Sequence, residues 1–201
     1  MILLVLLIVS ITFGSVIAGI LRTDKLLDEC LLEKSFRACS KLAEAHFIVI
    51  ATAHRLGYEV EDAWDAYKFF IMLSCKYGDE FSCVEAGSYY IGYVDGFIYG
   101  LEKAGKAALS KDARISTKAI DIFKEAKYIH VLACGVSKLY SASFTIREEY
   151  RKACKGLYSS LQKLKNFMIQ KLGFTEEEIR KIKIPDKFPL PDHMKHLSNY
   201  E

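Results

Sequence analysis

The sequence lacks the short patterns that carry most catalytic chemistry. It has no phosphate-binding glycine loop and no nucleophile elbow, and its cysteines do not show the CxxC spacing of a zinc site. The 28 basic and 25 acidic residues nearly cancel, so the net charge indicates no particular partner. Only 3 prolines and 12 glycines occur among 201 residues, and strand-like alternation is scarce. These absences argue against low-complexity disorder, against a β-sheet protein and against an enzyme.

What the sequence has in quantity is helical periodicity. Apolar residues make up 51% of the chain, which suits one domain with a sizeable core. They recur with a period near 3.6, so we expect an all-α domain over residues 22–182. Residues 183–201 include Pro185, Pro189 and Pro191, which predict an extended C-terminal tail along the surface.

The chain begins with a long uncharged segment. Ile2–Leu21 contains no charged residue and ends in small side chains, which fits a signal peptide cleaved after Ala18. However, no Lys or Arg precedes the apolar run, and twenty apolar residues also suffice to span a bilayer. The alternatives for residues 1–21 are a signal peptide, an N-terminal membrane anchor and a buried core helix. In the first two cases the rest of the chain is exported, to the periplasm, the extracellular space or the outer side of a membrane.

Capping and turn residues predict the limits of the individual helices. The second half of the first expected helix is apolar all round, as in a buried helix. The first two expected helices are Asp24 to Arg55 and Glu61 to Lys76, and a third starts at Glu80 after a Gly78-Asp79 turn. A fourth is capped by Ser116 or Thr117 and ends near Leu139. A fifth is capped by Thr145 with Glu148 and ends at Gly173, and a short sixth is capped by Thr175 with Glu178.

Small residues repeat every four positions along the third expected helix, beside an aromatic stripe. The small residues are Ser88, Gly92, Gly96 and Gly100, and the aromatic residues are Tyr89, Tyr93 and Phe97. Each of the three glycines costs roughly 1 kcal/mol in a helix relative to alanine. Close approach of another backbone is the expected compensation. The alternative is a groove that accepts a ligand or a partner helix.

Six cysteines in an exported chain indicate disulfides. The alternative is a set of buried free thiols in a reducing cytosol. Cys75 and Cys83 lie on either side of the Gly78-Asp79 turn. If the two flanking helices run antiparallel, a disulfide could close that turn.

A weak internal repeat suggests how the helices are arranged. The segment around Cys39 aligns with the segment around Cys83 at an offset of 83 − 39 = 44 residues, and each copy has a further cysteine upstream, Cys30 and Cys75. Repeats of this length are typical of stacked helical hairpins. We therefore expect antiparallel hairpins stacked in a repeat-like bundle.

The stretch from Asp62 to Tyr90 resembles the SEL-one-like repeat family, which is related to the tetratricopeptide repeats, and especially its cysteine-rich secreted branch. In that branch a segment like Cys75–Cys83 joins one repeat to the next. The glycine-rich loop of the family is reduced here to residues 57–60. The positions that match the family besides this segment are Asp62, Ala66, Phe69, Phe70, Gly87 and Tyr90.

The resemblance implies a disulfide-stapled helical stack with the bridge Cys75–Cys83 and, by analogy, Cys30–Cys39. The remaining cysteines, Cys134 and Cys154, are equidistant from residue 144, where a turn between helices is expected. An antiparallel hairpin would bring these two together. Six cysteines nevertheless allow fifteen pairings, so this set is one hypothesis among several.

A second resemblance competes with the first. Tyr89, Gly92, Asp95 and Gly96 show the spacing found in small periplasmic immunity proteins that neutralise type VI secretion amidases. That family is also helical and disulfide-bonded, but its later cysteine- and proline-containing segment is not found in this chain. The resemblance would imply a dimer that binds a toxin hydrolase tightly.

The titratable residues form no set that we interpret as catalytic. His46 and His54 lie on roughly one face of a helix and are interpreted as structural. Asp192, His193 and His196 could ligate a metal, but they lack a third strong ligand, so we expect no metal site. An acidic cluster between residues 59 and 65 fits the preference of helix N-termini for negative charge.

Basic residues predominate in the expected helix that follows Thr145. A solvated face is the simpler interpretation, and contact with anionic lipid or an acidic partner is the alternative. The basic residues are Arg147, Arg151, Lys152, Lys155, Lys163, Lys165 and Lys171.

Taken together, these patterns predict a non-catalytic, exported or membrane-tethered helical protein that binds a protein or peptide partner, for example as an accessory subunit of a membrane complex. The candidate binding residues are Tyr89, Tyr93, Asp95 and Phe97. We expect no cofactor, no metal and no nucleic acid, with the membrane as a partner through residues 2–21 if they are retained. The alternative function is that of a periplasmic immunity protein.

Overall fold

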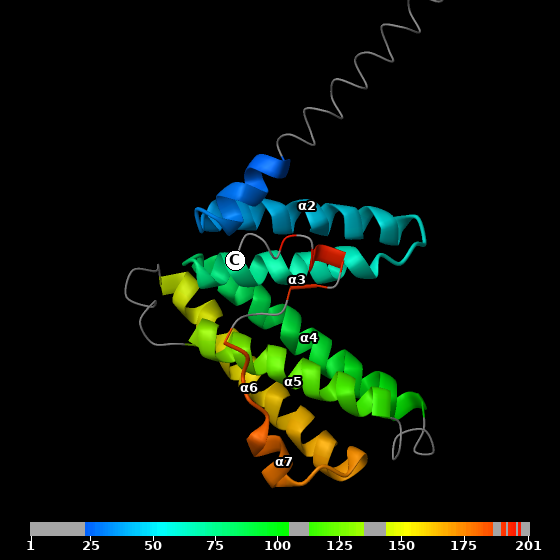
Figure 1. Ribbon diagram of the computed structural model, residues 1–201. Coiled ribbons are helices and arrows are strands. Elements are labelled where there is room, and N and C mark those ends of the chain that lie inside the picture. Colours follow the sequence, from blue (N-terminus) through cyan, green and yellow to red (C-terminus); the bar gives the residue numbers. More distant parts are fainter. Residues whose placement is uncertain are drawn as a thin grey trace, which may run out of the picture. The chain divides into compact units, whose positions relative to one another are not determined.

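The computed structural model describes residues 23–104, 113–134, 144–186, 190–191, 193–195 and 197 (Figure 1). All regular secondary structure in this part of the chain is helical. The chain divides into two compact units, Met1–Tyr77 with Pro191–Glu201 (unit 1) and Gly78–Leu190 (unit 2). The residues expected to form one helical domain are thus divided between the two units. The expected N-terminal signal peptide or anchor lies outside the described residues.

Unit 1 is built on a pair of antiparallel helices, α2 (Phe36–Arg55) and α3 (Glu61–Lys76). Ser74 Oγ donates a hydrogen bond of 3.0 Å to the carbonyl oxygen of Phe36, and the ring of His46 stacks on Phe70 with centroids 5.6 Å apart. Contacts that pair the start of one helix with the end of the other define an antiparallel hairpin. The predicted limits of α3 and of the turn at Gly57, which has a φ of 77°, are confirmed.

The single helix expected from Asp24 to Arg55 is wrong, because the chain turns a corner within it. Residues 23–31 form one helix, and α2 begins only at Phe36. Lys34 has a φ of 55°, and the Ser35 side chain caps α2 by accepting a hydrogen bond of 3.4 Å from the backbone N–H of Ala38. The disulfide Cys30–Cys39, with a Cα–Cα distance of 4.9 Å, joins the two helices across this corner.

The prediction that the second half of α2 is buried all round is also wrong. Ile50 is 5% exposed, but Phe47, Ile48 and Val49 are 49%, 57% and 49% exposed. A helix that packs on one partner buries only one side, and three consecutive apolar residues cover more than half of the helix circumference. In the described structure α2 therefore keeps an apolar side that is only about half covered.

The end of the chain belongs to unit 1. Residues 193–195 and 197 adopt a short 3₁₀ conformation, in which Met194 and Leu197 are buried. The imidazole Nδ1 of His193 lies 3.6 Å from a carboxylate oxygen of Asp62 at the start of α3. Residues 193–195 and 197 are thus held in unit 1 by buried apolar side chains.

Unit 2 contains α4 (Glu80–Ala104), α5 (Ala113–Cys134), α6 (Phe144–Leu172) and α7 (Glu176–Lys181). Helices α4 and α5 run antiparallel, and the buried Tyr90 hydroxyl donates a hydrogen bond of 2.9 Å to Glu125 between them. Helices α5 and α6 also run antiparallel and are joined by the disulfide Cys134–Cys154, whose Cα atoms are 5.8 Å apart. As a result, α4 and α6 lie side by side and run parallel (Figure 1).

An apolar seam along α6, whose residues recur every three or four positions, forms the core of unit 2. Among the residues of this seam, Leu157, Leu164 and Met168 have no exposed surface, and Leu161 is nearly buried. Gly173, with a φ of 78°, ends the helix as expected. Thr175 and Glu178 form the predicted capping box at the start of α7.

Two other predicted helix caps are wrong. Helix α5 begins at Ala113, so Thr117 lies inside it and its hydroxyl donates a hydrogen bond of 2.8 Å to the Ala113 carbonyl. Helix α6 begins at Phe144, so Thr145 lies within its first turn. A threonine inside a helix bonds back to the preceding turn and gives the same sequence signal as a threonine at a cap.

The glycine face of α4 does not pack against another backbone. No described atom comes within 4 Å of the position that a Cβ would take at Gly92, Gly96 or Gly100. The close approach occurs instead at Gly156 of α6, where a Cβ would lie 2.6 Å from Cδ1 of Ile91 on α4. The expectation of tight packing along the glycine face is therefore wrong.

The described cysteines are all in disulfides. Besides the two bridges above, Cys75 and Cys83 are disulfide-bonded, and no free cysteine occurs in the described chain. The expected all-α, disulfide-stapled fold is confirmed, and the disulfides indicate an oxidising, non-cytosolic environment. None of the described helices combines the length and the apolar character needed to cross a membrane.

Candidate functional site

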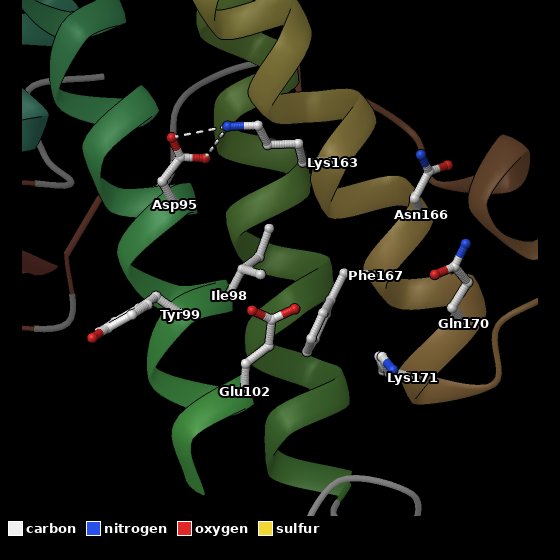
Figure 2. A pocket seen from close by; sticks show the side chains of 9 residues that line it. All are labelled: Asp95, Ile98, Tyr99, Glu102, Lys163, Asn166, Phe167, Gln170 and Lys171. Atoms are coloured by element: carbon white, nitrogen blue, oxygen red, sulfur yellow. Dashed lines mark hydrogen bonds and ion pairs between the residues drawn. The ribbon is translucent and has the colours of Figure 1, made fainter. Parts of the chain in front are cut away.

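A groove opens between the parallel helices α4 and α6 of unit 2 (Figure 2). Its volume is about 610 Å³, which lies within the range of small-molecule and peptide sites. We call it the α4–α6 groove. It is lined by Asp95, Ile98, Tyr99 and Glu102 of α4 and by Lys163, Asn166, Phe167, Gln170 and Lys171 of α6.

The two walls follow from helical spacing and from one close helix contact. The lining residues follow the pattern i, i+3, i+4, i+7 along each helix, so each wall is one helix face. Toward the N-terminal side of the groove, a Cβ at Gly87 would lie 3.4 Å from the Cβ of Ala153, and the absence of a side chain at Gly156 leaves room for Ile91. Small residues allow the two helices to approach closely there, and the groove opens at later positions of both helices.

The floor of the groove is apolar. Phe167 is 5% exposed and Ile98 is half-buried. Phe97 supports the floor, because its ring meets that of Phe167 edge to face with centroids 6.5 Å apart. A ligand in the groove would therefore rest on a rigid apolar surface.

One end of the groove is bridged by an ion pair. Lys163 Nζ lies 3.2 Å and 3.3 Å from the two carboxylate oxygens of Asp95, as the dashed lines in Figure 2 show. The buried Ser160 hydroxyl donates a further hydrogen bond of 3.4 Å to Asp95. Both charged side chains are substantially exposed, so this pair contributes at most about 1 kcal/mol to stability. It can exchange its partners for those of a ligand at little cost.

The middle of the groove presents polar groups that have no partner in the described part of the chain. Among the described residues, no ion pair or side-chain hydrogen bond involves Glu102 of α4, or Asn166, Gln170 and Lys171 of α6. All four side chains are exposed, and Figure 2 shows the Glu102 carboxylate pointing into the space beside Phe167. The groove thus offers an anion on one wall, with a cation and two amides on the other.

The four candidate binding residues fall into two places. Asp95 lines the groove and Phe97 supports its floor. Tyr89 and Tyr93 instead stack on each other, with centroids 5.8 Å apart, and do not line the groove. The structure therefore does not bring the four residues into one site.

Sequence reasoning missed the wall that α6 provides. In the sequence, Lys163 and Lys171 of that wall stand out only as part of a basic helix, and their spacing carries no information about α4. Lys163 meets Asp95 only because α5 returns the chain so that α6 runs parallel to α4. The small residue Gly156 is a weak local signal of a close helix contact, because it is a single glycine in a 29-residue helix.

Much of the basic character of α6 is compensated within unit 2. Arg151 pairs with Glu148 at 2.8 Å, and Lys152 pairs with Glu149 at 2.9 Å. Lys165 lies 3.5 Å from Glu176 of α7. Together with the Lys163–Asp95 pair, these contacts favour the simpler interpretation, a solvated helix face.

The histidines do not form a metal site in the described structure. His193 lies near Asp62, whereas Asp192 and His196 lie outside the described residues. Among the described residues, no cluster of three or more His, Cys, Asp or Glu could hold a metal ion. His46 is half-buried against Phe70, and His54 is exposed on the same helix.

We expect the stability of unit 1 to fall as the pH drops below neutral. Burial, and secondly the charge of His193, lower the pKa of His46, so the unfolded chain binds a proton more readily than the folded chain. This contribution is complete above the unfolded histidine pKa of about 6.5 and is lost as the pH falls through it toward the lower folded value.

The measurement is urea denaturation between pH 7.5 and pH 5, followed by circular dichroism. In His46→Gln the loss of stability with acid should be smaller than in the wild type, and the exposed histidine variant His54→Gln is the matched control. An equal acid dependence in wild type and His46→Gln would contradict this explanation.

Comparison of this chain with protein-family models, with curated proteins and with solved structures found no match. The class that the fold defines is therefore an all-α, disulfide-stapled protein with a polar groove. The resemblances to the SEL-one-like repeats and to the immunity proteins stay predictions.

Proposed function

We propose that this chain is an exported or membrane-tethered, non-catalytic protein that binds a peptide segment of a protein partner in the α4–α6 groove. The observation that carries the proposal is a polar set above an apolar floor: Glu102, Asn166, Gln170 and Lys171 have no ion pair or side-chain hydrogen bond with any described residue. Such a floor with a few polar groups that fix orientation is the usual composition of a recognition site.

The chemistry of the groove fits a peptide. Asn166 and Gln170 each carry a donor and an acceptor, and they lie one helical turn apart, so both can bond to a peptide backbone. Glu102 and Lys171 would pair with a basic and an acidic group of the same ligand. The Ile98 and Phe167 floor would take one apolar side chain of that ligand.

The disulfides support the exported location, because bridges persist in oxidising compartments. The uncharged segment Ile2–Leu21 supports export through a signal peptide or retention as an anchor. A partner exposed in the same compartment is therefore the expected ligand.

The proposal is tested by selecting peptides from a random phage-displayed library on the full chain and titrating them by calorimetry. Lys171→Glu and Glu102→Lys should each weaken binding of the selected peptides about tenfold or more, since each leaves a ligand charge facing a like charge. Lys155→Glu, an exposed lysine of α6 away from the groove, is the matched control.

Equal affinity of Lys171→Glu, Glu102→Lys and the control would contradict binding in the groove. If instead the chain binds a toxin hydrolase tightly as a dimer, and substitution of Asp95 abolishes that binding, the immunity function is favoured.

A further inference from the structure

The outward face of α2 in unit 1 is a regular row of six exposed residues. Their positions follow intervals of 4, 3, 4, 4 and 3, so they lie along one side of the helix. The residues that α2 buries lie on the other side, among them Leu42, Ala43 and Ile50. We call the row the outer face of α2. It consists of Arg37, Lys41, Glu44, Ile48, Thr52 and Arg55.

The centre of the outer face is apolar. Ile48 is 57% exposed, and its neighbours Phe47 and Val49, which flank it around the helix, are each 49% exposed. Phe47 also contacts the ring of Tyr67 on α3, with centroids 5.8 Å apart. Three adjacent, half-exposed apolar side chains form a contiguous surface, whereas single exposed apolar residues need no explanation.

Cations lie toward both ends of the same face. Arg37 and Lys41 precede the apolar centre and Arg55 follows it, whereas Glu44 is the one acidic residue of the row. The four charges sum to 3 − 1 = +2. Among the described residues no ion pair involves any of the four, in contrast to the locally paired charges of α6.

The described chain begins at residue 23, and one short helix separates that residue from α2. Ile2–Leu21 carries no charged residue and is long enough to cross a bilayer. The helix of residues 23–31 spans only about 13 Å at 1.5 Å per residue. The Cys30–Cys39 disulfide then holds its end against the first turn of α2. A retained anchor would therefore keep α2 near the membrane surface.

From this arrangement we propose that the outer face of α2 lies on the surface of a bilayer that contains anionic phospholipid. Phe47, Ile48 and Val49 enter the boundary between headgroups and acyl chains, and Arg37, Lys41 and Arg55 face the lipid phosphates. This surface lies in unit 1 and is independent of the proposed α4–α6 groove in unit 2.

A second copy of the chain fits this face less well. In a two-fold dimer each cationic end would meet an identical face of the same net charge. A stable protein interface also buries about 800 Å² on each side, more than three half-exposed side chains supply. In anionic lipid, the phosphates neutralise the net positive charge of the face, and the boundary below the headgroups accepts its shallow apolar centre.

The test places a fluorescent reporter at the centre of the face in the full chain. Ile48→Trp is made in a Trp64→Phe background, which removes the one natural tryptophan. The protein is reconstituted into phosphatidylcholine vesicles with about 30 mol% phosphatidylglycerol, with and without lipid that carries a spin label near the headgroup. Val131→Trp, at a 58% exposed position of α5, is the matched control.

We expect the spin-labelled lipid to quench Ile48→Trp at least twice as strongly as Val131→Trp. Adding Arg37→Glu, Lys41→Glu and Arg55→Glu should reduce the quenching of Ile48→Trp to the level of the control. Val49→Trp is a second reporter if Ile48→Trp folds poorly, as judged by circular dichroism.

Equal quenching of the reporter and the control would overturn the proposal. So would a reporter that is already shielded from water without vesicles and is not quenched by labelled lipid, because a protein surface would then cover the face. Quenching that is unaffected by the three charge reversals would overturn the assignment of anionic lipid.

Discussion

Replacing both Cys134 and Cys154 by serine is expected to lower the free energy of unfolding by about 3 kcal/mol. The bridge closes a segment with a sequence separation of 20 residues and joins the end of α5 to the first turns of α6. Without it, the unfolded chain gains the freedom of that loop, whereas the folded helices keep their other contacts. Guanidinium denaturation followed by far-ultraviolet circular dichroism measures the loss.

The matched control is the double serine variant of Cys30 and Cys39, whose sequence separation is 9. The logarithmic dependence on loop length predicts that this bridge contributes about 0.7 kcal/mol less than the longer one. If the shorter loop proved the more stabilising, or if neither pair of substitutions changed the denaturation midpoint, restriction of the unfolded chain could not be the main effect of these bridges.

The second large effect is expected at Gly156, where Gly156→Leu should destabilise unit 2 by about 1–3 kcal/mol. A Cβ at this position would already lie 2.6 Å from Cδ1 of Ile91, and the remaining leucine atoms would have to displace that side chain and separate α4 from α6. The denaturation midpoint measures the loss. Since the α4–α6 groove depends on the spacing of these helices, peptide binding should weaken in the same variant.

Two further variants separate packing from helix propensity. At Gly100, where no described atom lies within 4 Å of a Cβ, alanine should stabilise the helix by about 0.5–1 kcal/mol. Adding Ile91→Ala to Gly156→Leu should recover part of the lost stability, because it makes room for the leucine. If Gly156→Leu and Gly100→Ala had the same effect, the contact with Ile91 would not explain the glycine in α6.

Local chemistry predicted the helices where it was unambiguous. Gly57 and Gly173 have positive φ and follow helix ends as expected, and Thr175 with Glu178 makes both bonds of the capping box. These signals are contained within a few residues, so no knowledge of the fold is needed to read them. The apolar seam of α6 is equally local, because the spacing of its apolar residues identifies the buried side of the helix.

The corner before α2 could not be read in this way. Lys34 takes a left-handed conformation that usually selects glycine, and Ser35 caps a helix within a stretch that otherwise reads as one continuous helix. The exposure of Phe47 and Val49 also cannot be predicted from the sequence, because apolar composition does not say how many neighbouring helices pack against α2. Both features depend on how α2 packs, which its own sequence does not specify.

The groove depended on contacts between distant residues. Asp95 was predicted as a binding residue, yet its partners Ser160 and Lys163 come 65 and 68 residues later. The glycines of α4 predict a helix contact on a side of α4 that does not line the groove. Small residues have the same spacing whether they face another helix or solvent. Only the parallel run of α4 and α6 shows which side is used.

The Cys30–Cys39 bridge also determines how a pulling force would pass through unit 1. Tension applied at residue 22 would travel along the helix of residues 23–31 and then through the sulfur atoms to Cys39, so the corner itself would carry no load. Fully stretched, the nine steps between the two cysteines would span about 30 Å, whereas the bridge holds their Cα atoms at 4.9 Å. If the chain is tethered at its N-terminus, the connection between the tether and α2 would therefore be short and could not lengthen under tension.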